Sequence, residues 1–105
     1  MKPFDIFITN MSWGNGDKHR PVLVFIIDEN NVEIYRITTQ YENKSSDIKA
    51  LYFKIDDWKQ AGLVKQSYVD IGTLITLPND IFKNKTSIGK LTENDKQRLL
   101  EFLSN

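Results

Sequence analysis

The stretch Val22–Ile27 is the feature that most restricts how this chain folds. It is continuously apolar, short and rich in β-branched residues, which is typical of a strand buried on both faces. Asp28-Glu29-Asn30-Asn31 follows, and asparagine tolerates the positive φ of a tight turn. Val32–Tyr41 then has the composition of a return strand. The sequence therefore predicts a β-hairpin between these two segments.

Three further segments have strand composition: Phe4–Thr9, Ala50–Ile55 and Ser67–Leu77. Gly72 lies inside the last of them, where a glycine marks a bulge or a bend. Most of these strands follow one another through short loops. This arrangement favours an antiparallel, barrel-like sheet.

Glu42–Lys49 is polar and is interpreted as a mobile loop. Helical signals come after it, and the first is Asp56–Gly62, which is interpreted as one helical turn that ends at Gly62. Thr92, with Asp95 three residues later, resembles a capping box. The apolar face of Leu99–Leu103 follows, so a helix is predicted to end at Ser104. The expected fold class is mainly β with a C-terminal helix.

Length and composition narrow the class of protein. The 105 residues contain no linker-like segment that would mark a domain boundary, so they are interpreted as a single domain, residues 1–105. Lys plus Arg and Asp plus Glu are both 14, whereas a protein that coats duplex DNA is usually basic. The chain has no cysteine, which excludes disulfide scaffolds and thiolate zinc sites and suits a reducing cytosol. No signal peptide or membrane span is recognisable, so a cytoplasmic protein without membrane contact is expected.

Several kinds of chemistry are excluded by residue type. His19 is the only histidine and cannot form a His–His ribonuclease pair. The acidic pairs Asp28-Glu29 and Asp56-Asp57 are sequence neighbours, and neighbours on a strand point to opposite faces. No glycine-rich phosphate loop precedes a helix. Neither a metal site nor a cofactor is therefore predicted.

The segment Gly14–Pro21 is the strongest candidate for a site. A flexible loop ends there in Lys18, His19 and Arg20. Pro21 fixes its own φ and biases Arg20 toward an extended conformation, and a guanidinium matches a phosphate with two parallel hydrogen bonds. The predicted hairpin brings Thr38 and Thr39 close to Arg20. From spacing alone, a solvated basic patch and ordinary strand threonines are the simpler interpretation.

Five segments occur in an order that carries more information than any one of them. They are Asp5–Ile8, then Lys18–Val24 with its Arg-Pro-Val-Leu-Val, then Ile37–Gln40, then Gly62–Val69, and finally Ile88–Leu91 before an amphipathic helix. Together they resemble the MazF/PemK family of ribonuclease toxins from toxin–antitoxin systems. The resemblance spans nearly the whole chain.

This resemblance implies an SH3-like, CcdB-like small barrel and a homodimer. It also implies an antitoxin partner and metal-independent cleavage of single-stranded RNA at short sequences. The motif match places the family's catalytic arginine on Arg20 and its catalytic threonine on Thr38. Some members carry Glu, Gln and Arg where this chain has Gly72, Thr73 and Ile75, so its RNA preference is expected to differ.

RNA carries its own nucleophile, the 2′-hydroxyl, so an enzyme has only to align and stabilise the phosphate. Arg20 and Thr38 are predicted to contact the pentacovalent phosphate, and a 2′,3′-cyclic phosphate is the expected product. His19 is the candidate general base. Residues predicted to bind RNA are Lys18, Thr39, Gln40, Lys65 and Trp13, the last by base stacking.

Three other functions fit the same sequence. Small barrels bind RNA or proteins without any chemistry, and such a module would leave bound RNA intact. Gyrase poisons of the CcdB type share the barrel, but they depend on C-terminal contact residues and not on an Arg–Thr pair. A catalytically silent relative of the nucleases is the third alternative.

Overall fold

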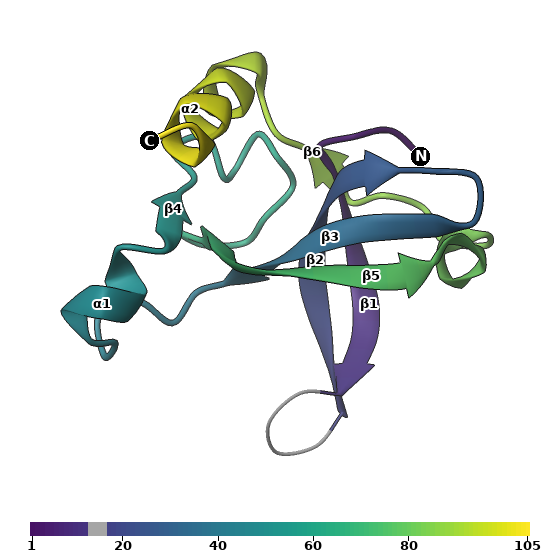
Figure 1. Cartoon of the computed structure of the whole chain (residues 1–105), viewed down its shortest axis with the longest axis horizontal. Coiled ribbons are helices and arrows are strands. Elements are labelled where there is room, and N and C mark those ends of the chain that lie inside the picture. The colour runs from purple at the N-terminus through teal and green to yellow at the C-terminus, as the bar shows by residue number, and fades with distance from the viewer. Residues whose placement is uncertain (13–16) are drawn as a thin grey trace.

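The computed structural model describes residues 1–12 and 17–105, and the side chains of residues 1–10 and 19–105. Within these ranges, six strands form one antiparallel sheet in the order β4-β5-β3-β2-β1-β6 (Figure 1). The strands are β1 (Asp5–Ser12), β2 (Asp17–Ile27), β3 (Asn31–Thr38), β4 (Tyr52–Lys54), β5 (Tyr68–Pro78) and β6 (Gly89–Lys90). The helices are α1 (Ser46–Lys49), the 3-10 helix η1 (Asn79–Phe82) and α2 (Glu93–Leu103).

The predicted hairpin is present as β2 and β3. Ile27 pairs with Val32, and the turn is closed by Asp28, whose Oδ1 accepts the backbone N–H groups of Asn30 at 2.9 Å and Asn31 at 2.7 Å. The doubly buried stretch is shorter than predicted. It ends at Val24, because the β2–β3 register shifts between Val24 and Ile26, and this shift leaves Ile26 45% exposed.

The predicted irregularity at Gly72 is also confirmed. Ile34 pairs with Ile75, but Arg36 pairs with Asp70, so β5 carries extra residues around Gly72. The Gly72 N–H donates to Asp70 Oδ1 at 2.9 Å. This hydrogen bond stabilises the bulge and orients the carboxylate of Asp70, which is part of the candidate site described below.

The segment Glu42–Lys49 is not a loop throughout. Its second half forms α1, because Ser45 caps the helix by accepting the Ile48 N–H, and Asp47 lies in the first turn. Serine at the N-cap and an acidic residue in the first turn both stabilise a helix start. This part of the sequence prediction was wrong because the cap was overlooked.

The two faces of the sheet carry separate hydrophobic clusters. In β1, Ile6 belongs to a cluster that Leu99 of α2 covers, while its neighbour Phe7 belongs to a cluster that Phe82 of η1 covers. We call these the α2 cluster and the η1 cluster. In β2, Leu23 belongs to the α2 cluster and its neighbour Val22 to the η1 cluster. Strand alternation explains this division. The α2 cluster therefore fills one face, and the η1 cluster fills part of the other.

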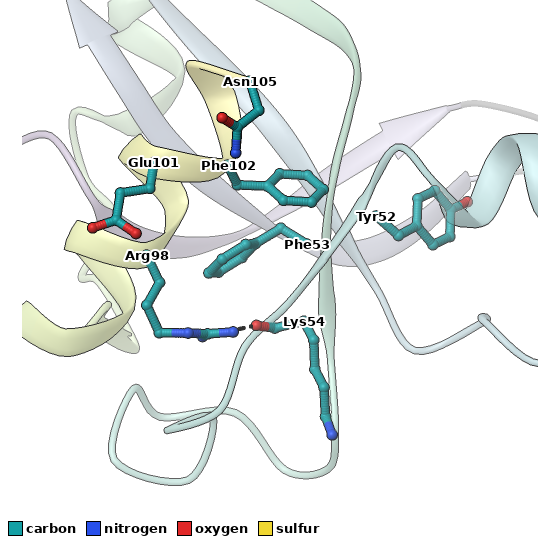
Figure 2. Close-up of a pocket in the computed structure, with 7 residues that line it drawn as sticks. All are labelled: Tyr52, Phe53, Lys54, Arg98, Glu101, Phe102 and Asn105. Carbon is teal, nitrogen blue, oxygen red and sulfur yellow. Dashed lines mark hydrogen bonds between the residues drawn. The ribbon is translucent and has the colours of Figure 1, made fainter.

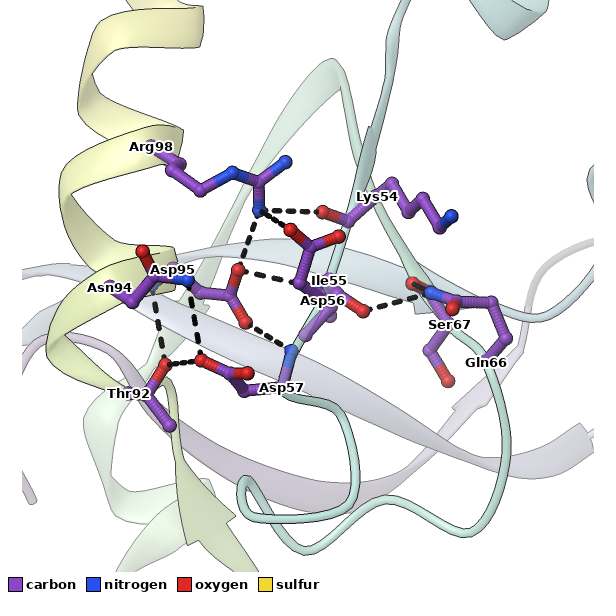
Figure 3. Close-up of polar contacts among 10 residues, drawn as sticks. All are labelled: Lys54, Ile55, Asp56, Asp57, Gln66, Ser67, Thr92, Asn94, Asp95 and Arg98. Atoms are coloured by element: carbon purple, nitrogen blue, oxygen red, sulfur yellow. Dashed lines mark hydrogen bonds and ion pairs between the residues drawn. The ribbon is translucent and has the colours of Figure 1, made fainter.

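Helix α2 is fixed to the rest of the chain through Asp95, which is fully buried (Figure 3). Its two carboxylate oxygens accept the backbone N–H groups of Asp56 at 3.2 Å and Asp57 at 2.7 Å. Arg98 donates to the same carboxylate at 2.6 Å. The predicted cap is confirmed, because Thr92 Oγ1 accepts the Asp95 N–H at 3.2 Å.

The predicted turn before Gly62 packs directly on β6. Gly62 has φ +91°, its N–H donates to the Lys59 carbonyl, and the Leu63 N–H donates to the Trp58 carbonyl. These two bonds form a Schellman motif, which confirms a helical turn ending at Gly62. A Cβ on Gly89 would lie 2.0 Å from the Ala61 carbonyl oxygen. The two backbones therefore touch, and both glycines are required by packing.

Candidate functional site

Arg20 and Thr38 lie at the end of the hairpin, in adjoining strands. Arg20 pairs with Thr9 of β1, and Thr38 pairs with Tyr68 of β5. The paired register of β2 and β3 ends at Val22 and Arg36, next to Pro21, which has no N–H to continue the ladder. Arg20 and Thr38 each lie two residues beyond this last pair, on neighbouring strands but not paired with each other.

Side chains two residues apart on a strand lie on the same side of the sheet. Alternation therefore places Arg20 on the side of Val22, and Thr38 on the side of Ile34, which is the face that carries the η1 cluster. In Figure 1, β1 and β2 cross β3 and β5 near the middle of the sheet, and the start of β2 and the end of β3 diverge beyond this crossing. We call the polar end of this surface the Arg20 face, defined by Thr9, Arg20, Arg36, Thr38, Tyr68 and Asp70.

The Arg20 face contains two buried polar atoms that have no hydrogen-bond partner among the described residues. They are Arg20 Nε and Thr9 Oγ1, and Thr9 is only 1% exposed. No ion pair among the described residues involves Arg20. A buried donor without a partner costs about 1–3 kcal/mol, so such an atom in a folded protein points to a ligand site.

Arg36, the second guanidinium on this face, has a different environment. Its Nη2 forms an ion pair with Asp70, whose side chain is only 8% exposed. Asp70 is fixed in turn by the Gly72 N–H. The sequence does not reveal this pair, because 34 residues separate its partners. An aspartate inside the otherwise apolar and β-branched stretch of β5 was the available signal.

Among the other predicted residues, His19 is not brought to Arg20. It is exposed and pairs with Asn10 of β1. Since neighbours along a strand alternate, His19 points to the opposite side of β2 from Arg20. Gln40 contacts Thr38 through its backbone, because the Gln40 N–H donates to Thr38 Oγ1 at 3.1 Å. The side chains of Thr39 and Gln40 are exposed just beyond β3.

Three predicted RNA-binding residues are not joined to the Arg20 face by any described contact. Lys65 is exposed in the segment before β5, where its carbonyl accepts the Ser67 hydroxyl at 2.9 Å. Trp13 and the side chain of Lys18 lie outside the described residues. Of the residues predicted from the sequence, Arg20 and Thr38 are therefore the two that lie on the Arg20 face.

Two clefts lie elsewhere on the molecule. One, of about 390 Å³, separates β4 from α2 and is lined by Phe53, Arg98 and Phe102 (Figure 2). The other, of about 400 Å³, lies between the N-terminus and the residues leading into α2. Neither is lined by Arg20 or Thr38. In the described ranges, no cluster of three potential metal-ligating side chains occurs, and no helix has the length and hydropathy of a membrane span.

No protein family model and no curated protein matches this sequence. Among solved structures, the toxin MazF-mt6 of Mycobacterium tuberculosis is similar to the chain, with a TM-score of 0.68 and 24% sequence identity. The match covers 96% of this chain and 93% of that chain. The chain has a MazF-type fold. This finding confirms the predicted mainly β class with a C-terminal helix, and it gives the family resemblance a structural basis.

Proposed function

We propose that the protein is an endoribonuclease toxin that cleaves single-stranded RNA without a metal ion. One observation carries this proposal: Arg20, whose buried Nε has no hydrogen-bond partner in the described part of the chain, lies on the same face as Thr38. The fold supports the proposal but does not by itself establish an activity.

The electrostatics of the face favour Arg20 as the group that binds the scissile phosphate. The Arg36 guanidinium is neutralised by Asp70. Arg20 forms no ion pair with any described carboxylate, so its positive charge is available to an anion. A guanidinium donates two parallel hydrogen bonds to phosphate oxygens and stays protonated at neutral pH.

Thr38 is suited to donate to the same phosphate. Its Oγ1 already accepts the Gln40 N–H, which leaves the hydroxyl hydrogen for an acceptor on the Arg20 face. In the proposed reaction the RNA 2′-oxygen forms a bond to phosphorus while the bond from phosphorus to the 5′-oxygen breaks. The proton of the 2′-hydroxyl ends on that 5′-oxygen. Arg20 and Thr38 stabilise the negative charge on the pentacovalent phosphate.

Cleavage of a long single-stranded transcript tests the proposal. We expect a limited set of fragments whose 3′ ends carry a 2′,3′-cyclic phosphate, and we expect the same rate in the presence of EDTA. Sequencing of the fragment ends and chemical analysis of the terminal phosphates provide the measurement. Salt-dependent binding of intact RNA, with no cleavage, would instead identify a binding module.

Two substitutions of Thr38 distinguish the contribution of its hydroxyl group from that of its side-chain shape. Thr38→Val is expected to lower the single-turnover cleavage rate by about 10- to 100-fold, which is the value of one hydrogen bond to a charged group. Thr38→Ser keeps the hydroxyl and is expected to retain most of the rate. The matched control is Thr76→Val, an exposed strand threonine that pairs with Glu33. Equal rates for Thr38→Val and Thr76→Val would remove Thr38 from the mechanism.

The proposed function also includes two partners. By analogy with the fold, we infer a homodimer and a cognate antitoxin that covers the Arg20 face. An antitoxin bound there supplies acceptors to the free guanidinium and blocks RNA from it. The physical requirement on this partner is an acidic or hydrogen-bond-accepting side chain that reaches Arg20 Nε.

A further inference from the structure

Three tyrosines from separate segments gather beside Thr38. Tyr68 of β5 pairs with Thr38 in the sheet, Tyr41 follows the end of β3, and Tyr52 begins β4. The rings of Tyr41 and Tyr68 are stacked, with centroids 4.3 Å apart and planes 8° apart. The Tyr41 and Tyr52 centroids are 6.3 Å apart. We call these three residues the tyrosine platform.

The platform is not part of the hydrophobic core. None of its members belongs to either core cluster, and all three are partly exposed. β4 shows the difference clearly. Phe53 points toward α2 and contacts Phe102 at 5.5 Å between centroids, whereas Tyr52 points away from the helix (Figure 2). The rings are thus held in place by one another at the surface of the sheet.

The charge around the platform suits a nucleotide. Lys49 Nζ lies 5.0 Å from the centre of the Tyr41 ring and adds a positive charge beside it, which the exposed Glu42 carboxylate at 4.0 Å balances in part. Burial raises the pKa of Tyr52 and Tyr68 above the usual 10.0, with smaller contributions from Asp70 and Glu42 respectively. A tyrosine is already uncharged at neutral pH with its ordinary pKa, and these shifts keep both hydroxyls so; neither therefore repels phosphate.

We propose that the tyrosine platform stacks a nucleobase of the nucleotide next to the phosphate held by Arg20 and Thr38. This inference rests on the proposed function and deepens it. Tyr68 lies one strand from Thr38, and neighbouring strands are about 4.8 Å apart, so the ring is within the reach of an adjacent nucleotide. Every base has a π-face, and the platform therefore adds affinity for single strands without choosing a sequence.

The test measures binding of an RNA oligonucleotide that spans the mapped cleavage site, with a 2′-deoxy nucleotide at that site to prevent cleavage. Two further oligonucleotides lack the base on the 5′ or the 3′ side of the scissile phosphate. We expect the native protein to bind one of these two about tenfold more weakly. The Tyr41→Leu/Tyr68→Leu variant is expected to bind the intact oligonucleotide about tenfold more weakly and to be insensitive to base removal.

The Tyr41→Phe/Tyr68→Phe variant keeps both rings and serves as the matched control, with affinity expected close to that of the native protein. Thermal unfolding of all variants shows that they are folded. The inference is overturned if the leucine variant responds to base removal as the native protein does, or if the native protein responds at neither position.

Failure of the nuclease proposal has a different signature, because the protein would then cut no transcript. The platform is in that case tested with single-stranded DNA of about eight nucleotides, a length within the range that small domains cover. We expect oligothymidylate to bind more tightly than an abasic strand of equal length, and the leucine variant to lose this difference. If the native protein binds oligothymidylate and the abasic strand equally tightly, the tyrosine platform does not stack bases, whatever the outcome for the nuclease proposal.

Discussion

Replacing Arg20 with methionine is expected to lower the RNA cleavage rate by about a thousandfold while leaving the fold intact. Removal of one preorganised donor from a developing oxyanion costs about 10²–10³ in rate, and no described carboxylate neutralises the positive charge of Arg20. Methionine has a similar length and no donor. Single-turnover cleavage of a labelled transcript measures the loss.

The same substitution is expected to preserve stability or to raise it by about 1 kcal/mol. Arg20 Nε is buried without a hydrogen-bond partner, and removal of such a group relieves a desolvation cost. Residues kept for function often oppose stability in this way. Urea unfolding monitored by circular dichroism gives the free energy of unfolding. A variant that unfolds, or one that cleaves at the native rate, would contradict the role assigned to Arg20.

Arg98→Met is the matched control, because it makes the same change where the arginine is structural. Arg98 donates to Asp95 at 2.6 Å and to the Lys54 carbonyl at 3.2 Å, and its guanidinium carbon lies 4.9 Å from the Phe53 ring centre. We expect this variant to lose stability and to retain activity where it is folded. The two substitutions should therefore give opposite patterns.

The largest effect on stability is expected from Asp95→Ala. This change leaves the Asp56 and Asp57 N–H groups without their acceptor, and each donor left unsatisfied costs about 1–3 kcal/mol. Arg98 loses one of its acceptors and keeps Asp56 and the Lys54 carbonyl. Domains have only about 5–15 kcal/mol in total. A decrease in the urea-derived free energy of unfolding equal to the cost of the two unsatisfied donors is the expected result.

Glu101→Ala provides the control for Asp95, since it removes a carboxylate from the exposed side of the same helix. Its expected effect is within about 0.5 kcal/mol of zero. If the two substitutions destabilise the protein equally, Asp95 does not anchor α2 to the residues after β4, and the packing described for this helix would need another explanation.

Local patterns were sufficient to predict the hairpin, the Gly72 bulge and the capped C-terminal helix. Each of these depends on residues within a few positions of one another, so turn, bulge and cap chemistry is visible in the sequence. The strand β6 was missed because Gly89 and Lys90 are too short a segment to show alternation. Helix α1 is not apparent from the sequence because it has one turn and buries no apolar residue, so its Ser45 cap is the main local signal.

The candidate site was predictable only in part. The hairpin predicted that Arg20 and Thr38 lie near each other, whereas their proposed roles come from the motif match and stay a prediction. His19 was assigned a role on proximity in sequence, but strand alternation directs it to the other face. The Arg36–Asp70 pair and the tyrosine platform join residues from different strands and loops. Their contacts depend on the β3–β5 register and its bulge, which no local pattern specifies.

The most direct test of the central claim is a double-mutant cycle between Arg20 and Thr38 in single-turnover RNA cleavage. If both side chains act on one phosphate, the Arg20→Met/Thr38→Val protein should lose much less than the product of the two single losses, because groups that act as a unit are non-additive. Losses that multiply would show that the two residues act independently, and would contradict a shared phosphate on the Arg20 face.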